Sequence, residues 1–288
     1  MKIEVLKSEN WPLLLKEIPD LPEKLYIRGT LPDWNQKFLC VVGARRFTSY
    51  GKESCEKLIA GLRGYPITIV SGLALGIDSI AHKAALTAGL KTLSVPGSGL
   101  SPEAIHPRIH RALAEKIVEA GGALLSEFEP DFRATLWAFP QRNRIMAGLA
   151  NATLVVEAEK KSGTLITAKL ATEYNRDVLT IPGSIFSPNS EGPHLLLRLG
   201  ATPITSPAEL LEALGFKTEV KNSQAQLALA YADCSSDEKK ILELLREPLT
   251  RDILIGKLNF PASRTNALLS VLEIKGLIKE SMGELHLT

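Results

Sequence analysis

The sequence has little of several residue types on which whole classes of protein depend. Phe, Trp and Tyr together make up only 6% of its 288 residues, so we expect no binding surface paved with stacking aromatic rings. Its three cysteines, Cys40, Cys55 and Cys234, have no short metal-ligand spacing, and an odd number of cysteines suits a reducing compartment. The net charge is only +2, so an anionic partner has to meet a local basic patch.

Leader, membrane and cofactor signals are also missing. No apolar run approaches the roughly 20 residues that a helix needs to cross a bilayer, and no charged segment followed by an apolar one opens the chain. The order Lys160-Lys161-Ser162-Gly163-Thr164 is not that of a P-loop, so ATP hydrolysis is not supported. We therefore expect a cytoplasmic protein with no membrane partner, no cofactor and no metal.

Between residues 38 and 214 short apolar runs alternate with longer amphipathic ones. Continuously apolar strands indicate a sheet covered on both faces, and strands that alternate with helices form βαβ units. The sequence thus predicts an α/β fold, a Rossmann-like doubly wound and mostly parallel sheet. The expected strands are Phe38–Val42, Ile67–Val70, Thr92–Val95, Ala123–Leu125, Leu154–Val156 and Val178–Ile181, and helical patterns cover Gly51–Leu62, Ser79–Thr87, Arg111–Ala120 and Leu165–Tyr174.

The regions on either side of this domain have a different composition. Residues 1–35 contain four prolines, which predicts a lead-in segment with at most short helical pieces. Residues 36–215 are the Rossmann-like domain, and polar residues 216–235 are a linker. Residues 236–288 predict a small winged-helix-like domain of three helices and a hairpin. Its expected elements are Asp237–Leu245, Arg251–Leu258, Ala262–Lys275, Leu277–Glu280 and Glu284–Leu287.

Glycine-rich turns follow the first three expected strands, where ligands collect in open α/β sheets. Gly43 and Arg45 close the first strand, Ser71 and Gly72 the second, and Gly97 the third. Such turns let backbone N–H groups approach a phosphate, and each can equally be an ordinary tight turn. Beyond the second turn lie an aspartate and a histidine, four residues apart. They could form a metal-binding or catalytic pair, but we favour a structural hydrogen bond that fixes the turn. These two residues are Asp78 and His82.

Basic residues follow the later strands as well. Arg108 and Arg111 follow the third strand, where they oppose the dipole of the helix that they begin. Three polar residues, Arg142, Asn143 and Arg144, lie between apolar neighbours, so the arginines are expected to meet either acidic residues such as Glu127 or Glu157, or a phosphate. The helix expected at Leu165–Tyr174 is preceded by a lysine, a serine, a glycine and a threonine. This combination suits either a phosphate site or an ordinary capped helix start. The four residues are Lys161, Ser162, Gly163 and Thr164.

Four motifs in this order resemble the DprA/Smf (DNA-processing protein A) family. They are residues 41–45 (VVGAR), 71–78 (SGLALGID), 139–145 (FPQRNRI) and 162–168 (SGTLITA). The resemblance covers about residues 12–215, and it implies a homodimer that binds single-stranded DNA without sequence preference and helps to load the RecA recombinase in natural transformation. Two departures from the family pattern, Ala44 for Ser and Leu75 for Arg, put one contact in doubt.

The resemblance also assigns site residues by position. Arg45 matches a phosphate-binding arginine, and Arg111 matches a basic residue after the third strand, with Arg108 as the fallback. Ser71, Gly72, Gly97 and Asn143 match positions near the backbone of the bound strand. The full set of expected DNA contacts is Gly43, Arg45, Ser71, Gly72, Gly97, Arg108, Arg111, Arg142, Asn143, Arg144, Lys161, Ser162, Gly163 and Thr164.

Two other functions compete with this expectation of a binding protein that is not an enzyme. A phosphoribohydrolase-like enzyme shares the core, but residues 96–99 (PGSG) lack the threonine and the placed glutamate of that group's signature. A regulator could bind duplex DNA through residues 237–288, but this tail has 8 Lys and Arg against 8 Asp and Glu, which disfavours duplex binding.

Overall fold

The computed structural model describes residues 2–217, 233–245, 247–258, 260–281 and 283–287. The chain forms two compact units, residues 1–218 and 219–288, and most of the expected linker lies outside the described residues. Within those ranges no helix is both long and apolar enough to cross a membrane.

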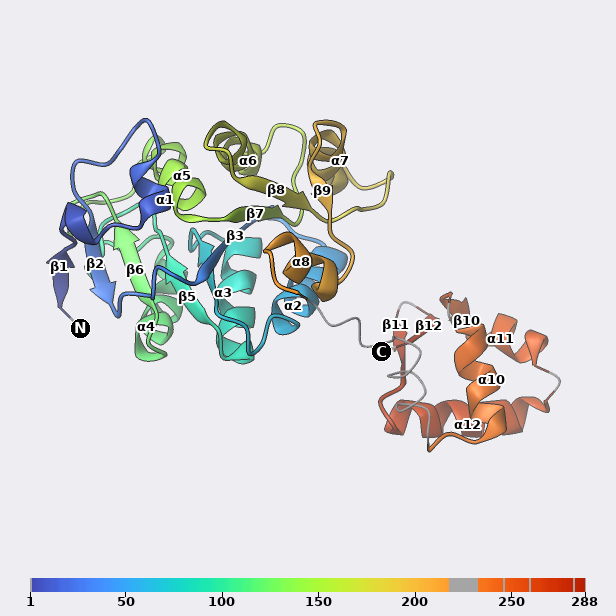
Figure 1. Ribbon diagram of the computed structural model, residues 1–288. Coiled ribbons are helices and arrows are strands. Elements are labelled where there is room, and N and C mark those ends of the chain that lie inside the picture. The colour runs from blue at the N-terminus through green and yellow to red at the C-terminus, as the bar shows by residue number, and fades with distance from the viewer. Residues whose placement is uncertain (1, 218–232, 246, 259, 282, 288) are drawn as a thin grey trace. The chain divides into compact units, whose positions relative to one another are not determined.

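A nine-stranded sheet forms the centre of the first unit (Figure 1). Its order is β1-β2-β6-β5-β4-β3-β7-β8-β9, and the seven strands from β6 to β9 run parallel. The expectation of a doubly wound, mostly parallel sheet is confirmed, and all six expected strands are present. The strands are β1 (Ile3–Val5), β2 (Tyr26–Gly29), β3 (Lys37–Val42), β4 (Ile67–Ser71), β5 (Lys91–Ser94), β6 (Ala123–Ser126), β7 (Ala152–Val155), β8 (Asp177–Thr180) and β9 (Thr202–Pro203).

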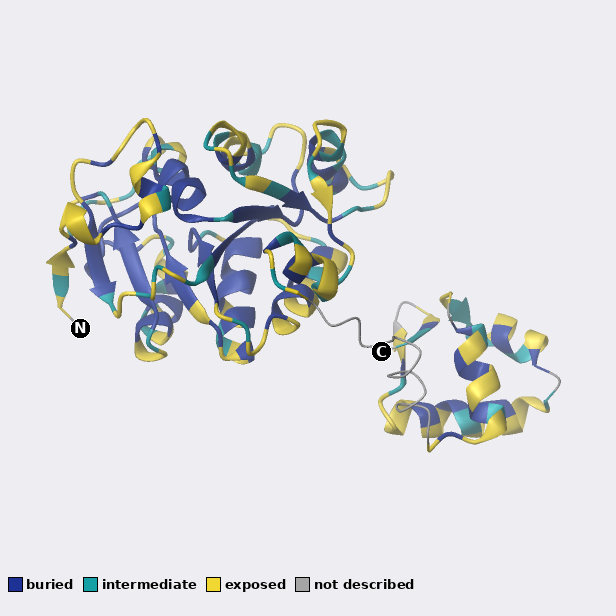
Figure 2. Ribbon diagram, in the orientation of Figure 1, coloured by how far each residue is buried: buried dark blue, intermediate teal, exposed yellow. Residues whose placement is uncertain are grey.

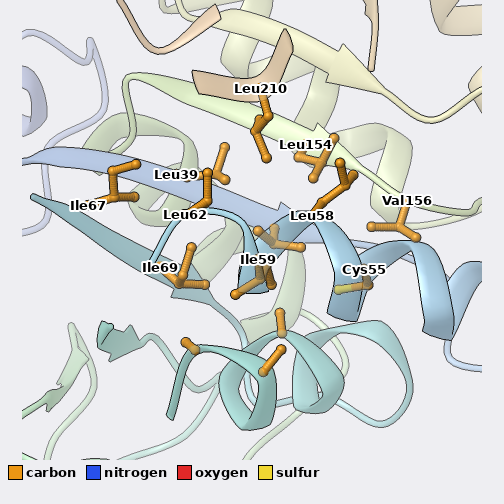
Figure 3. Close-up of a cluster of buried hydrophobic side chains, with 14 of the residues drawn as sticks. Leu39, Cys55, Leu58, Ile59, Leu62, Ile67, Ile69, Leu154, Val156 and Leu210 are labelled. Atoms are coloured by element: carbon orange, nitrogen blue, oxygen red, sulfur yellow. The ribbon is translucent and has the colours of Figure 1, made fainter. Parts of the chain in front are cut away.

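Helices cover both faces of the sheet. On one face lie α2 (Ser49–Ala60), α3 (Ile77–Ala88), α4 (Arg111–Glu119) and α8 (Pro207–Ala213), and on the other lie α1 (Leu13–Lys16), α5 (Ala138–Leu149), α6 (Thr164–Glu173) and α7 (Glu191–Arg198). Short 3₁₀ turns cover Ser8–Asn10, Arg108–His110 and Pro188–Ser190. Figure 2 shows the central strands buried and the outer helix faces exposed. Apolar cores lie on both faces, and Figure 3 shows the one where Leu58 and Ile59 of α2, with Leu62 just after it, pack against Leu39 and Ile69 of the sheet.

The N-terminal 35 residues are more integrated than the sequence indicated. They supply β1 and β2, which add to β6 as an antiparallel edge of the sheet. Arg28 of β2 is buried and pairs with Glu115 of α4 at 2.6 Å. Helix α1 packs on α5 at Gly148, where an added Cβ would lie 3.2 Å from Leu15 of α1 and 2.7 Å from Ile18 just after it. The expectation of a lead-in without strands was wrong, because the prolines lie between these elements and not inside them.

The second unit has the winged-helix plan that the sequence predicted. Three helices surround a ten-residue apolar core, and a hairpin follows the third helix. The elements are α10 (Ser236–Leu244), β10 (Leu249–Thr250), α11 (Arg251–Lys257), α12 (Ala262–Ile274), β11 (Ile278–Ser281) and β12 (Glu284–Leu287). Ser235 and Glu238 form a reciprocal capping box at the start of α10, which satisfies two backbone N–H groups and sets where the helix begins.

Candidate functional site

The strand order places a switch point between β3 and β7. From β3 the chain builds the sheet outward through β4, β5 and β6, and it then returns to the other side of β3 with β7, β8 and β9. The loops that follow β3 and β7 therefore diverge and leave a crevice at the carboxyl ends of the strands. A pocket of about 590 Å³ opens there.

Half of the fourteen expected site residues line this pocket. They are Gly43, Arg45, Arg142, Asn143, Ser162, Gly163 and Thr164. The remaining seven, Ser71, Gly72, Gly97, Arg108, Arg111, Arg144 and Lys161, are not among its lining residues. Three arginines line it, Arg45, Arg46 and Arg142, together with two acidic residues, Asp78 and Glu159. The lining therefore has one positive charge in excess.

Arg45 and Arg46 are the exposed cations of the pocket. The Arg45 guanidinium lies over the ring of Phe139 at 5.6 Å from its centroid, so the ring face holds the cation without neutralising it. The same ring packs on Gly97, where an added Cβ would lie 2.6 Å from the ring. Gly97 is thus a glycine because α5 packs closely against the turn after β5.

A buried carboxylate holds the loop that presents these two arginines. Glu157, only 4% exposed at the end of β7, accepts a hydrogen bond from the Thr48 backbone N–H at 2.9 Å and a second from the Thr48 hydroxyl. Asn189 donates to the same carboxylate at 3.3 Å and to the Arg46 carbonyl at 2.9 Å. Loops that follow β3, β7 and β8 are therefore joined at one group.

Two buried groups of opposite charge, Arg142 and Asp78, lie at the floor of the pocket. Arg142, 4% exposed, donates to the Gly72 carbonyl at 2.6 Å and to the Val95 carbonyl. Asp78, 6% exposed, accepts from the Gly72 N–H at 3.2 Å. Burial raises the pKa of Asp78, and the charge of Arg142 is the main influence that lowers it. Arg142 also fills the space beside Gly72, so the pair fastens α5 to the turns after β4 and β5.

Arg144 lies in a different environment from Arg142. It is buried and forms ion pairs with Glu127 and, at 3.3 Å, with Asp20. The expectation that an acidic residue such as Glu127 meets one of the two arginines is confirmed for Arg144. Its pairing with Asp20 also fastens the N-terminal segment to α5.

Ser71, an expected site residue, and His82, considered as a partner of Asp78, both have buried hydrogen-bond partners within the fold. Ser71 is fully buried, and its hydroxyl donates to the Val41 carbonyl at 2.6 Å. His82 lies 2.6 Å from the Thr92 hydroxyl, and burial lowers its pKa to about 3. Asp78 and His82 therefore have separate hydrogen-bond partners, so the expected hydrogen bond between them was wrong.

Another part of the pocket lining is the start of α6. Thr164 donates from its hydroxyl to the Gly43 carbonyl at 3.1 Å, which joins this turn to the one after β3. Gly163 is exposed, and an added Cβ would meet no atom within 4 Å. This glycine, unlike Gly72 and Gly97, leaves open space at a helix start, where anions are favoured. Lys161 is exposed two residues earlier.

Arg108 lies on the segment between β5 and α4, and Arg111 is the first residue of α4. Arg108 is exposed, and half-buried Arg111 donates to the Glu103 carbonyl of its own loop. Between them, His110 donates to the Leu73 carbonyl at 2.7 Å. Leu73 has a φ of 61°, an uncommon conformation for a residue with a side chain, so His110 secures the turn after β4.

Sequence reasoning missed the apolar residues around the opening of the pocket. Leu136 and Ile166 line it and are 89% and 41% exposed, and the adjacent Trp137 is 55% exposed. The only signal was the pair of large apolar residues within the polar loop that precedes α5. Among the described residues no group of three or more His, Cys, Asp or Glu side chains is arranged to hold a metal ion.

Two family models match the chain. The model described as DNA recombination-mediator protein A matches residues 2–215, and the model described as the DprA winged helix domain matches residues 225–284. Protein Smf of Escherichia coli is 44% identical over 209 residues, which are 73% of this chain and 55% of that protein. DNA processing protein DprA of Streptococcus pneumoniae is 41% identical over 73% of each chain.

Two solved structures share the fold. The structure of DNA processing protein A from Streptococcus pneumoniae has a TM-score of 0.69 and 38% identity, and the match covers 76% of each chain. The protein from Helicobacter pylori, whose structure concerns its single-stranded DNA binding mode, has a TM-score of 0.65 and 30% identity over 74% of this chain and 95% of that one.

Proposed function

Because this chain belongs to the DNA recombination-mediator protein A (DprA/Smf) family, we propose that it binds single-stranded DNA, with phosphates in the pocket between β3 and β7. The observation that carries the proposal is the pairing of two exposed arginines with the open helix start at Gly163 across one pocket. Since phosphates carry no sequence information, binding is expected to be independent of base sequence.

The proposed DNA contacts are the expected residues that line the pocket, apart from Arg142, together with the exposed Lys161 beside it. They are Gly43, Arg45, Asn143, Lys161, Ser162, Gly163 and Thr164. Arg108 and Arg111 extend the interface onto the segment after β5. Burial and internal partners support a structural role for Ser71, Gly72, Gly97, Arg142 and Arg144.

A comparison of single-stranded with duplex DNA tests this function. In gel shifts at two salt concentrations, the full chain is expected to bind a single strand more tightly than a duplex of the same length, with affinity falling as salt rises. The second unit supplies little for a duplex, since Arg264 of α12 pairs with Asp237 at 2.5 Å. Equal or tighter binding of the duplex overturns the proposal in favour of a duplex-binding regulator.

One assay distinguishes a phosphoribohydrolase-like enzyme from a DNA-binding protein. A phosphoribohydrolase releases the free base from a nucleoside monophosphate. We propose that this protein is a DNA-binding mediator and expect no base release during incubation with nucleoside monophosphates. Release of base that stops when the pocket is altered at Arg45 assigns the pocket to catalysis instead.

We further propose that the protein acts as a homodimer that helps RecA to assemble on the bound strand, in natural transformation or a related recombination process. The family resemblance supports both partners. Leu199 at the end of α7 is 73% exposed, and the neighbouring Leu195 and Leu197 are half-buried, so this face has apolar surface to bury. Light scattering is expected to show a dimer, and a pull-down is expected to recover RecA; a monomer at every concentration contradicts the first proposal.

A further inference from the structure

Two large apolar residues that line the pocket stand exposed, and a third stands exposed next to one of them in sequence. Leu136, Trp137 and Ile166, which we call the apolar rim, are 89%, 55% and 41% exposed. Two of them line the pocket itself, and the third is the neighbour of Leu136 in sequence. Clustered apolar side chains in contact with water are unfavourable unless a partner covers them, so the rim requires an explanation.

Trp137 is held in place by two other aromatic rings. Phe128 and Phe132 stack with their centroids 4.5 Å apart, and the indole meets them edge to face at 5.7 and 5.6 Å. More than half of the Trp137 side chain remains open beyond this support. An aromatic surface that is already fixed loses little conformational entropy when a flat partner stacks on it.

The charges beside the rim identify its occupant. Arg45 and Arg46 are exposed in the same pocket as Leu136 and Ile166, so a ligand that covers the rim also brings anionic groups to the arginines. An unpaired nucleic-acid strand combines both features, since every nucleotide has a phosphate and a flat apolar base. A duplex does not, because its base faces are stacked inside the helix.

We propose that the apolar rim binds the unpaired bases of the strand whose phosphates occupy the pocket, and that this contact makes the site prefer a single strand to a duplex. The inference rests on the proposed function. It assigns Trp137 as the principal base-stacking residue and Leu136 and Ile166 as apolar contacts beside it. Stacking on a ring accepts every base, so the rim leaves binding independent of sequence.

The test compares a thymine oligonucleotide with an abasic deoxyribose-phosphate strand of the same length. Trp137→Ala is expected to weaken binding of the thymine strand roughly 5- to 150-fold, without changing the slope of log affinity against log salt. Binding of the abasic strand is expected to stay as in the unmodified chain, and Trp137→Phe is expected to restore most of the loss.

Two further variants separate stacking from folding. Leu136→Ser removes a side chain that is 89% exposed, so it is expected to weaken the thymine strand selectively with an unchanged melting temperature even if Trp137→Ala unfolds. Phe186→Ala is the matched control, because this ring is 90% exposed but is not among the residues that line the pocket, and it is expected to change nothing.

The outcomes distinguish the rim from the proposed function. If the unmodified chain binds neither strand, the single-strand function itself fails. If it binds thymine and abasic strands equally and the rim variants have no effect, phosphate binding stands and the rim inference is overturned. An equal loss of both strands in Trp137→Ala and Leu136→Ser also overturns it, since the rim then acts on the fold or on phosphates and not on bases.

Discussion

Arg45→Ala is expected to weaken single-strand binding roughly tenfold to hundredfold, because a charge-assisted hydrogen bond to phosphate contributes about 1.5–3 kcal/mol. The loss should be equal for all base sequences, and the plot of log affinity against log salt should flatten by roughly 0.7. The melting temperature should stay unchanged, since the guanidinium is exposed and its described contact is the Phe139 ring. Titrations at several salt concentrations and a thermal melt on the same variant measure all three quantities.

Arg63→Ala supplies the control for this result. Arg63 is also exposed, but it lies between α2 and the start of β4, at the amino ends of the strands, where it donates to the Thr87 carbonyl at 3.1 Å. Its removal should leave affinity and salt slope as they were. If Arg45→Ala lowers the melting temperature and keeps the salt slope, Arg45 is structural and the pocket has lost its main phosphate contact.

Arg111→Ala measures how far the interface extends. Arg111 donates to the Glu103 carbonyl and is not among the residues that line the pocket. If Arg111→Ala flattens the plot of log affinity against log salt as much as Arg45→Ala does, the interface includes the segment after β5, as the family resemblance implies. If Arg111→Ala instead lowers the melting temperature and leaves the slope unchanged, the DNA interface is confined to the pocket.

The strands that sequence predicted are those buried on both faces. β3 and β4 have five buried residues each, so their sequences are nearly continuous apolar runs. The missed strands are β1, β2 and β9, which lie at the two edges of the sheet or, for β2, next to an edge. β1 has no buried residue and β9 has none either, and a two- or three-residue exposed strand leaves no periodic pattern to detect. Their pairing depends on the neighbouring strand and not on their own residues.

The location of the site was predictable, but the roles within it were not. Glycine and arginine turns after parallel strands meet at one edge of the sheet by topology alone, which placed Gly43, Arg45 and Gly163 together. The partner of Arg142 is a carbonyl 70 residues earlier in the chain, and no local pattern indicates it. The low aromatic content was likewise uninformative about Trp137, because composition does not say where the few rings lie.

The two kinds of arginine show how one pocket combines binding and folding. Arg45 is exposed and has the Phe139 ring beneath it, so its charge is available to a ligand. Arg142 is buried against the Gly72 and Val95 carbonyls, so its charge is already matched inside the fold. Substitutions at these positions should therefore have opposite signatures, one in affinity and the other in stability.

Arg142→Met is expected to lower the free energy of unfolding by about 3–5 kcal/mol, because removal of one buried charge leaves another buried charge of opposite sign uncompensated. The variant leaves the Asp78 carboxylate without its main compensating charge, and it leaves two carbonyls without their donor. Denaturant unfolding measures the loss. Arg63→Met is the matched control, since Arg63 donates to a carbonyl at the exposed surface and its loss should change stability by about 0.5 kcal/mol or less.

The pH dependence identifies Asp78 as the group left uncompensated. An acid whose pKa is raised in the folded state binds more protons folded than unfolded, so stability falls as pH rises above its ordinary pKa. Burial already raises the pKa of Asp78, and loss of Arg142 removes the largest opposing influence. The deficit of Arg142→Met should therefore be larger at about pH 8 than at about pH 5.

Asp78→Asn in the Arg142→Met background completes the argument. The neutral side chain removes the buried charge, so the double variant should be more stable than Arg142→Met alone and should lose the extra pH dependence, as expected for two coupled residues. A deficit that stays the same at both pH values and in the double variant shows that the lost carbonyl contacts, and not the charge pair, stabilise the floor of the pocket. Reduced DNA affinity with full stability in Arg142→Met would instead make Arg142 a DNA contact.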